Sequence, residues 1–133
     1  MSEPRLLLEE LLGQFPDAVL RVTGRCLEPR IREGERVRLR SARDCPPRFG
    51  DVVLTWQSGG LRLHRLVWAL GDRVRTQADR GLLDASLGRR EILATVIGVE
   101  DRPRPLDRRL AARSLLRALT RALSSRFAAA LAA

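Results

Sequence analysis

Residues 51–68, DVVLTWQSGGLRLHRLVW, carry the clearest structural signal in the chain. Apolar residues dominate both ends of this stretch, and a Ser-Gly-Gly turn at 58–60 separates them. Two short apolar runs joined by a glycine-containing turn are typical of an antiparallel β-hairpin. We therefore expect strands at 51–56 and 61–68 that pair with each other.

Further strands are expected on both sides of this hairpin. Segment 35–40, ERVRLR, alternates polar and apolar residues as a half-buried strand does, and 92–99, ILATVIGV, resembles a buried strand. The other predicted strands are 18–23 and 73–78, and 78–90 is predicted to be a loop with at most one helical turn. Five to seven short strands at regular spacing favour a β-barrel or folded sheet over βαβ units.

A helix is expected at each end of the chain. Leucines recur at helical spacing within 3–14, where Gly13 and the following Pro16 mark the end of the helix. A proline-containing linker at 101–107 precedes a second helix, in which a basic stripe runs beside an apolar one. The stripe consists of Arg109, Arg113, Arg117 and Arg121. We expect a β domain at 1–100, followed by the linker and a basic amphipathic helix at 101–133.

The composition narrows the classes of function. The chain has 133 residues, of which 44% are hydrophobic and 31% charged, the balance of one globular domain. An aromatic content of 4% argues against a protein that stacks single-stranded nucleic acid on aromatic side chains. All 25 basic residues are arginines, so no lysine is present as a general base. A base that works near neutral pH must be His64, the single histidine, or a perturbed carboxylate.

The chain contains two cysteines, Cys26 and Cys45. They are too few for a disulfide scaffold, and with His64 they remain too few for a four-ligand zinc site. We therefore expect no metal and no cofactor. The N-terminal segment carries acids inside its apolar run, unlike a secretory signal, and no run reaches the roughly 18 apolar residues of a membrane span. A cytoplasmic location is expected.

Five short motifs between residues 18 and 99 resemble, in order and spacing, those of the signal peptidase I family. The first, GRCLEP at 24–29 with GE at 34–35, is similar to that family's glycine, serine-methionine-x-proline and glycine-aspartate signature. The others are GDVV at 50–53, LHRLV at 63–67, TQAD at 76–79 and VIGV at 96–99. The histidine of LHRLV is typical of the endoplasmic-reticulum and archaeal branch, where it replaces the bacterial lysine. The resemblance implies the mainly β fold of signal peptidases and LexA-like peptidases.

The resemblance also implies a catalytic site. Cys26 stands at the position of the nucleophilic serine, and His64 stands at the position of the base. Asp84 or Asp79 would orient the imidazole, and the match slightly favours Asp84. A cysteine with a histidine base is a workable acyl-transfer pair, because imidazole can hold the thiol as a thiolate near neutral pH. The backbone N–H of Cys26 would donate to the oxyanion.

From this match we predict an endopeptidase that cleaves a peptide or protein precursor, such as a leader or signal-like segment. The cleavage would use a Cys-His dyad or a Cys-His-Asp triad, with Leu27 and Pro29 in the substrate-binding surface. The resemblance implies a substrate bound as an extended strand, with small residues beside the cut. The alternative is a catalytically inactive peptide-binding or regulatory module of the same fold.

Each candidate residue also has a purely structural interpretation. Without the match, Cys26 would be taken for a small buried hydrophobic residue, and a lone histidine on an alternating strand is usually structural. Asp79 and Asp84 lie in a polar loop where solvated carboxylates are common. Cys45, in a turn-rich connector, is interpreted as structural or incidental. A disulfide between Cys45 and Cys26 is less favoured and would silence the nucleophile.

The C-terminal helix at 108–133 is open to three interpretations. It would pack on the β domain, lie on an anionic membrane surface or bind an acidic partner, and the second implies a peripheral position at the inner membrane. The net charge of +9 would suit a nucleic-acid-linked regulator. However, no helix-turn-helix precedes the β domain, so nucleic acid is not an expected partner. The oligomeric state is left unknown.

Overall fold

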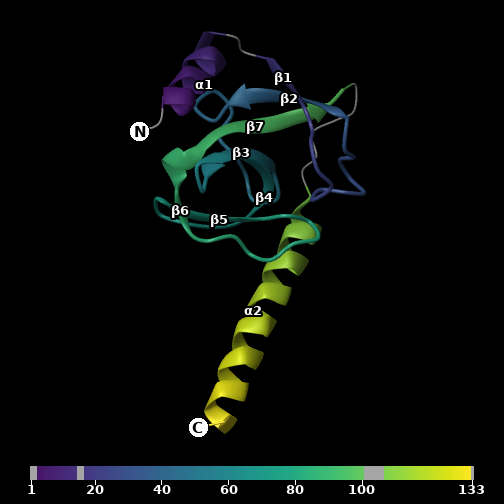
Figure 1. Ribbon diagram of the computed structural model, residues 1–133, viewed down its shortest axis with the longest axis vertical. Coiled ribbons are helices and arrows are strands. Elements are labelled where there is room, and N and C mark those ends of the chain that lie inside the picture. Colours follow the sequence, from purple (N-terminus) through teal and green to yellow (C-terminus); the bar gives the residue numbers. More distant parts are fainter. Residues whose placement is uncertain (1–2, 15–16, 101–106, 133) are drawn as a thin grey trace.

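Seven antiparallel strands form one sheet in the computed structural model, which describes residues 3–14, 17–100 and 107–132 (Figure 1). The strands are β1 (Ala18–Arg21), β2 (Arg36–Ser41), β3 (Val52–Gln57), β4 (Gly60–Leu70), β5 (Arg73–Gln77), β6 (Leu87–Gly88) and β7 (Ile92–Val99). The helices are α1 (Glu3–Gln14), the 3-10 turn η1 (Arg89–Glu91) and α2 (Arg108–Ala132). The expected mainly β class with a helix near each end is confirmed.

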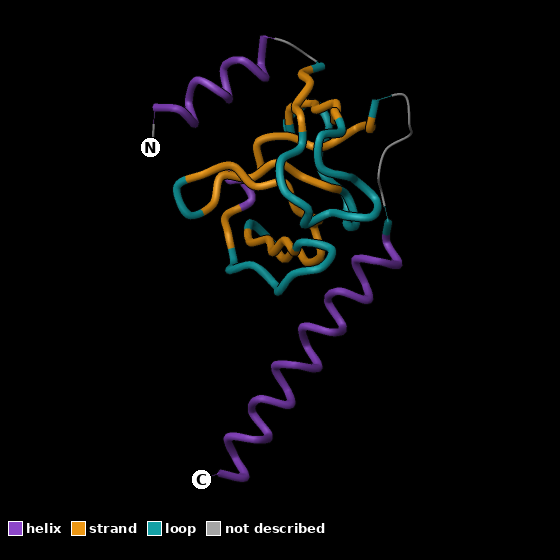
Figure 2. Tube along the Cα trace, turned by 45° about the vertical axis from the view of Figure 1, so that its right-hand side comes forward, coloured by secondary structure: helices purple, strands orange, loops and turns teal. Residues whose placement is uncertain are grey.

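The strand order in the sheet is β1-β2-β7-β3-β4-β5-β6, so the last strand, β7, is inserted between β2 and β3. The sheet curls into a half-barrel, as the two views together show (Figure 2). The predicted hairpin is confirmed, because β3 and β4 pair with Val53 opposite His64 and Leu54 opposite Leu63. His64 lies one residue before the centre of β4, the sheet's longest strand.

Two clusters of buried apolar side chains form the core. The larger one joins α1 and the loop after β1 to the sheet, and it contains Leu12, Val22, Leu27, Ile31, Val37, Leu39, Val52, Leu54, Leu93, Ala94, Val96 and Val99. The smaller one contains Val53, Leu66, Val74 and Ile92. Successive side chains of a strand point to opposite faces, which explains why neighbouring Val53 and Leu54 belong to different clusters. His64, opposite Val53, shares the face of the smaller cluster.

Some element boundaries differ from the sequence prediction. β1 ends at Arg21 instead of residue 23, because the backbone of Val22 bonds to residues 34 and 35 and closes a loop. The predicted loop 78–90 contains the short strand β6 and the start of the turn η1. The predicted linker 101–107 lies outside the described residues except for Asp107.

The two long helices pack on the sheet in different ways. α1 packs beside β2, and its buried Arg5 donates to Glu91 at 2.8 Å. α2 begins at a side-chain cap, in which the Asp107 carboxylate accepts the N–H of Leu110 at 2.8 Å. Its first turns pack on β4, and the rest projects away from the sheet (Figure 1). Among the described residues, no helix is both long and apolar enough to cross a membrane.

Candidate active site

Cys26 lies in a loop, residues 22–35, that is closed at its neck and anchored in the core. Two backbone hydrogen bonds of 2.8 Å join Val22 to the far end of the loop. Leu27 and Ile31 are 1% and 0% exposed and fix the middle of the loop in the larger core cluster. This anchoring holds Cys26 half-buried against the sheet.

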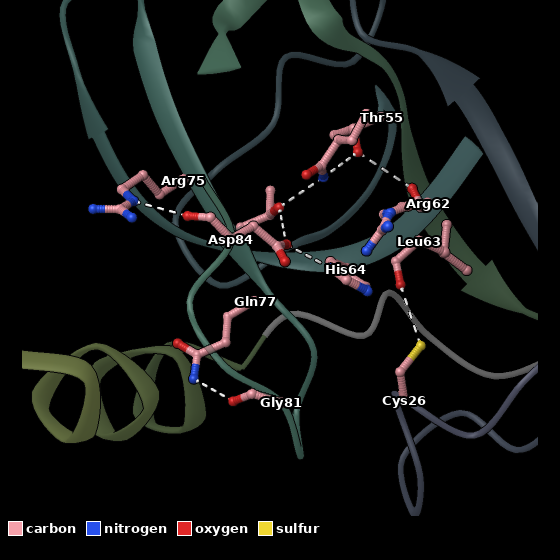
Figure 3. Close-up of polar contacts among 11 residues, drawn as sticks. Cys26, Thr55, Arg62, Leu63, His64, Arg75, Gln77, Gly81 and Asp84 are labelled. Carbon is pink, nitrogen blue, oxygen red and sulfur yellow. Dashed lines mark hydrogen bonds and ion pairs between the residues drawn. The ribbon is translucent and has the colours of Figure 1, made fainter. Parts of the chain in front are cut away.

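The thiol of Cys26 points at β4. Its Sγ donates to the carbonyl oxygen of Leu63 at 3.9 Å, one residue before His64 (Figure 3). Burial raises the pKa of the Cys26 thiol above its ordinary value, and the nearby charges of Asp79 and Asp84 act in the same direction. Within the described residues, no hydrogen bond joins the thiol to the His64 ring. Partial burial and the bond to a carbonyl therefore favour a neutral Cys26 thiol over a thiolate in the free protein.

The His64 ring is bonded to Asp84. His64 Nδ1 and Asp84 Oδ2 are 2.5 Å apart, and the two side chains are only 10% and 13% exposed. The pKa of Asp84 lies below its ordinary value, so this group is a carboxylate near neutral pH and must accept the bond. Nδ1 therefore carries a proton, and in the neutral imidazole Nε2 is then the accepting nitrogen. In the view of Figure 3 the ring lies between Asp84 and Cys26.

A second donor on β5 holds the same carboxylate. Thr76 Oγ1 donates to Asp84 Oδ2 at 2.6 Å, and Gln57 Nε2 donates to Thr76 Oγ1 at 3.0 Å and to Thr55 Oγ1 at 2.7 Å. Burial alone would raise the pKa of Asp84, but the hydrogen bonds from His64 and Thr76 outweigh it and lower that pKa. A buried chain of hydrogen bonds thus runs from Gln57 through Thr76 and Asp84 to His64.

Asp84 reaches His64 because the loop after β5 folds back along that strand. The backbone N–H of Asp84 donates to the carbonyl of Thr76 at 2.9 Å, and Gln77 forms a β-bridge with Leu83. Arg75 Nε donates to the carbonyl of Asp84 at 2.9 Å. These contacts fix the carboxylate without any contact from the loop that carries Cys26.

Asp79, the other predicted orienting residue, has a different partner. Its two carboxylate oxygens accept from Nε and Nη2 of Arg65 at 2.9 and 3.0 Å, and the two side chains are 4% and 1% exposed. Arg65 also donates to the carbonyl of Gly50 at 2.7 Å. Asp79 thus belongs to a buried ion pair that ties β4 to the loop after β5, and the structure joins Asp84, not Asp79, to His64.

Among the described residues, none of the other predicted residues is bonded to the His64–Asp84 pair. The side chain of Leu27 is 1% exposed and lies in the larger core cluster, which does not favour the substrate-binding role predicted for it. Pro29 is exposed on the same loop. Cys45 is a free, half-buried cysteine between β2 and β3, and its carbonyl accepts from Thr95 at 2.8 Å. Cys26 is also a free cysteine.

Sequence reasoning missed two members of the hydrogen-bond chain. Thr76 belongs to one of the five motifs but had no predicted role, and Gln57 belongs to none of them. A signal for these residues was present in β3. Its second half carries two polar residues, Thr55 and Gln57, on either side of Trp56 in a largely buried strand. Polar side chains at such positions need partners, and the hairpin partner carries His64.

Beside Cys26, one backbone edge of β4 has no strand partner among the described residues. β5 pairs with β4 only from Arg65 onward, so residues 60–64 pair with β3 alone within the described part of the chain. The backbone N–H and C=O of Leu66 bond toward the β3 side. Backbone direction alternates along a strand, so the groups of Leu63 face the open side, where its carbonyl contacts the thiol. An extended peptide added at this edge would pass Cys26.

Two other kinds of site find no support in the structure. Among the described residues, no group of three or more His, Cys, Asp or Glu side chains is placed to hold a metal ion. A cavity of about 840 Å³ lies between α1, the connector after β2 and η1, and its lining includes Arg5, Glu9 and Glu91. Arg5 bonds to both of these acids, and the cavity lining contains none of the predicted catalytic residues. The candidate catalytic residues Cys26 and His64 therefore lie outside this cavity.

Comparison of the chain with protein-family models, with curated proteins and with solved structures gives no match. The resemblance to signal peptidases therefore stays a prediction from the motifs.

Replacing Asp84 with asparagine is expected to lower the free energy of unfolding at pH 7 by about 1–3 kcal/mol, because His64 and Thr76 lose a charged acceptor. A carboxyl whose pKa is lower in the folded state stabilises the fold above its unfolded pKa of about 3.9, and this contribution is lost as the pH falls through the folded value. The difference in free energy of unfolding between wild type and Asp84→Asn should therefore shrink as the pH is lowered. Urea unfolding at pH 7 and pH 3 measures this difference. A difference that is as large at pH 3 as at pH 7 would contradict the role of Asp84 as a charged acceptor for His64 and Thr76.

Proposed function

We propose that this chain is a cysteine peptidase of the signal-peptidase/LexA-like fold, which cleaves a peptide or protein precursor held along β4. Cys26 is the nucleophile, His64 is the base and Asp84 orients the imidazole. The proposal rests on one observation, which is that three features occur together on neighbouring residues of β4. Leu63 contacts the thiol, His64 is bonded to a buried carboxylate, and the backbone edge beside them is open.

The elevated pKa of the Cys26 thiol favours one of two forms of this chemistry. In a resting thiolate-imidazolium pair the proton has left the sulfur before substrate arrives. Here burial favours the neutral thiol, so the proton moves to His64 during the attack, as in serine peptidases. Cys26 must first turn from the carbonyl of Leu63 toward Nε2. Catalytic hydrogen bonds often form only in the substrate complex, so their absence from the free protein does not exclude this step.

The reaction then follows from the arrangement. Nε2 of His64 takes the thiol proton as Sγ of Cys26 bonds to the scissile carbonyl carbon, and the oxyanion accepts the backbone N–H of Cys26. The C–N bond breaks, the imidazolium returns the proton to the leaving amine, and a thioester remains. Water, deprotonated by the same nitrogen, attacks the thioester and releases the carboxylic acid and the thiol. Asp84 stays ionised and stabilises the imidazolium in both steps.

The substrate would bind by strand addition. Main-chain hydrogen bonds to the open edge of β4 supply affinity that does not depend on sequence. By the family resemblance, specificity comes from small residues beside the cut. The anchored loop 22–35 leaves Pro29 exposed, whereas the buried side chain of Leu27 serves the loop and not the substrate.

A proteome-derived peptide library tests this function because it presents many candidate cleavage sites at once. Wild type should generate new N-termini that follow small residues, and mass spectrometry of the labelled N-termini detects them. The cleavage should vanish in Cys26→Ala and persist in the matched control Cys45→Ala. Products that are absent with wild type, or unchanged in Cys26→Ala, would overturn the proposal.

A second candidate is a peptide-binding module that no longer cleaves. It is favoured by one observation, which is that the half-buried thiol bonds to Leu63 and not to the imidazole. This function predicts that wild type and Cys26→Ala retain the same library peptides on a column and that neither produces new N-termini. The peptidase function instead predicts retained, intact peptides only for Cys26→Ala.

A further inference from the structure

The side of α2 that lies away from β4 carries a row of exposed leucines. Leu116, Leu119 and Leu123 are 65%, 52% and 66% exposed, and their spacing of three and four residues places them on one side of the helix. Ala111 and Ser114, which are 0% and 1% exposed, lie on the buried side of the helix instead. We call the three leucines the leucine ridge. In the described structure no element covers it, so its apolar area faces solvent.

A row of arginines runs beside the leucine ridge. Arg113, Arg117 and Arg121 are exposed and four residues apart, which places them along one side of α2. Residues 108–133 contain six arginines and no acidic residue, so no carboxylate within this segment neutralises the row. The surface therefore combines an uncovered apolar strip with an adjoining strip of positive charge.

We propose that α2 docks on an anionic lipid bilayer, with the leucine ridge at the acyl boundary and the arginine row among the headgroups. This goes beyond the proposed peptidase function and does not depend on it. Helices with an apolar strip and a basic face bind in this way, and both their apolar area and their charge contribute. A second copy of the chain would cover the leucines but would add another arginine row without acids to pair with it. Nucleic acid would pair with the arginines but leave the leucines in water.

The structure also fixes the docking helix to the candidate active site. The N–H of Asp107 donates to the carbonyl of Gly50 at 3.1 Å, the same oxygen that accepts from Arg65 on β4. The Asp107 carboxylate pairs with Arg30, on the loop of Cys26, at 2.9 Å. A Cβ at Gly50 would lie 2.9 Å from the backbone of Asp107, so this close approach needs glycine. Docking of α2 would therefore set the distance of the active site from the bilayer.

Sedimentation of the full-length chain with lipid vesicles tests the proposal. Vesicles of phosphatidylcholine with phosphatidylglycerol should bind the chain, and vesicles of phosphatidylcholine alone should bind it far more weakly. Each arginine near an anionic surface contributes about fivefold to the affinity, so changing Arg113, Arg117 and Arg121 to glutamine should weaken binding on the order of a hundredfold. Changing the leucine ridge to glutamine should weaken it by more than about tenfold.

Matched control variants separate the effect of the α2 surface from the effects of net charge and exposed hydrophobic area elsewhere in the chain. Arg21, Arg36 and Arg43 are exposed on the β domain, and changing them to glutamine removes the same net charge. Leu6, Leu7 and Leu11 are exposed on α1 at 45%, 55% and 51% and provide the matched leucine control. Both control triples should bind anionic vesicles like wild type.

Two results would overturn the proposal. One is that wild type does not bind anionic vesicles, and the other is that the α2 triples and the control triples lose binding equally. Self-association without vesicle binding, abolished by the ridge variant, would also overturn it and assign the ridge to a second copy.

Discussion

Replacing His64 with glutamine is expected to slow peptide cleavage by about 10²- to 10⁴-fold, the usual contribution of a general base. Partial burial raises the pKa of the Cys26 thiol, so in the proposed mechanism its proton is removed while the sulfur attacks. The glutamine amide still offers an N–H to Asp84 but has no ring nitrogen to accept the proton. Initial rates on a peptide selected from the library, at fixed pH, measure the effect.

The choice of glutamine guards against loss of the fold. His64 is only 8% exposed, and removing its side chain would leave the Asp84 carboxylate without its shortest contact. Asp84→Asn provides a second test. An amide no longer fixes the proton on Nδ1 of His64, so this substitution should also slow cleavage. If folded His64→Gln cleaved at the wild-type rate, the imidazole would have no part in the reaction.

Replacing Asp79 with asparagine is expected to destabilise the fold by about 3–5 kcal/mol, because it leaves the Arg65 guanidinium buried without its anionic partner. The pair is bidentate and almost completely removed from solvent, with side chains 1% and 4% exposed. It also lies where β4, the loop after β5 and Gly50 meet. The free energy of unfolding in urea measures the effect.

An exposed ion pair gives the control for this substitution. Asp17 and Arg40 are 2.9 Å apart but 53% and 41% exposed, so Asp17→Asn should change stability by only about 0–1 kcal/mol. The double variant Arg65→Met, Asp79→Leu should recover much of the loss, because apolar side chains need no partner there. Similar effects of Asp79→Asn and Asp17→Asn would show that burial does not govern the strength of the Arg65–Asp79 pair.

Hydrophobic periodicity predicted most of the fold because the strands that make the sheet alternate or are continuously apolar. The predicted Ser-Gly-Gly turn, whose first two residues join β3 to β4, fixed the hairpin and with it the position of His64. The insertion of β7 between β2 and β3 was not predictable in this way, since strand order depends on long-range pairing. β6 was missed because two residues are too short to show a period.

The candidate site was predicted less completely than the fold. The motifs named Cys26, His64 and Asp84, but spacing could not choose between two carboxylates five residues apart. The choice depends on two features of the folded chain. The loop after β5 folds back along that strand, and the buried Arg65 pairs with Asp79. The protonation state of Cys26 could not be predicted either, because it follows from burial and from two carboxylates brought close only by folding.

Acylation of Cys26 by p-nitrophenyl acetate, followed by intact mass, tests most directly whether His64 activates this thiol. The reagent takes the place of the peptide substrate, and a Cys45→Ala background leaves one reactive thiol. We predict a single acetyl group on Cys26, formed about 10² times faster or more than in the same background with His64→Gln. Equal rates in the two folded proteins would contradict a Cys26–His64 catalytic pair.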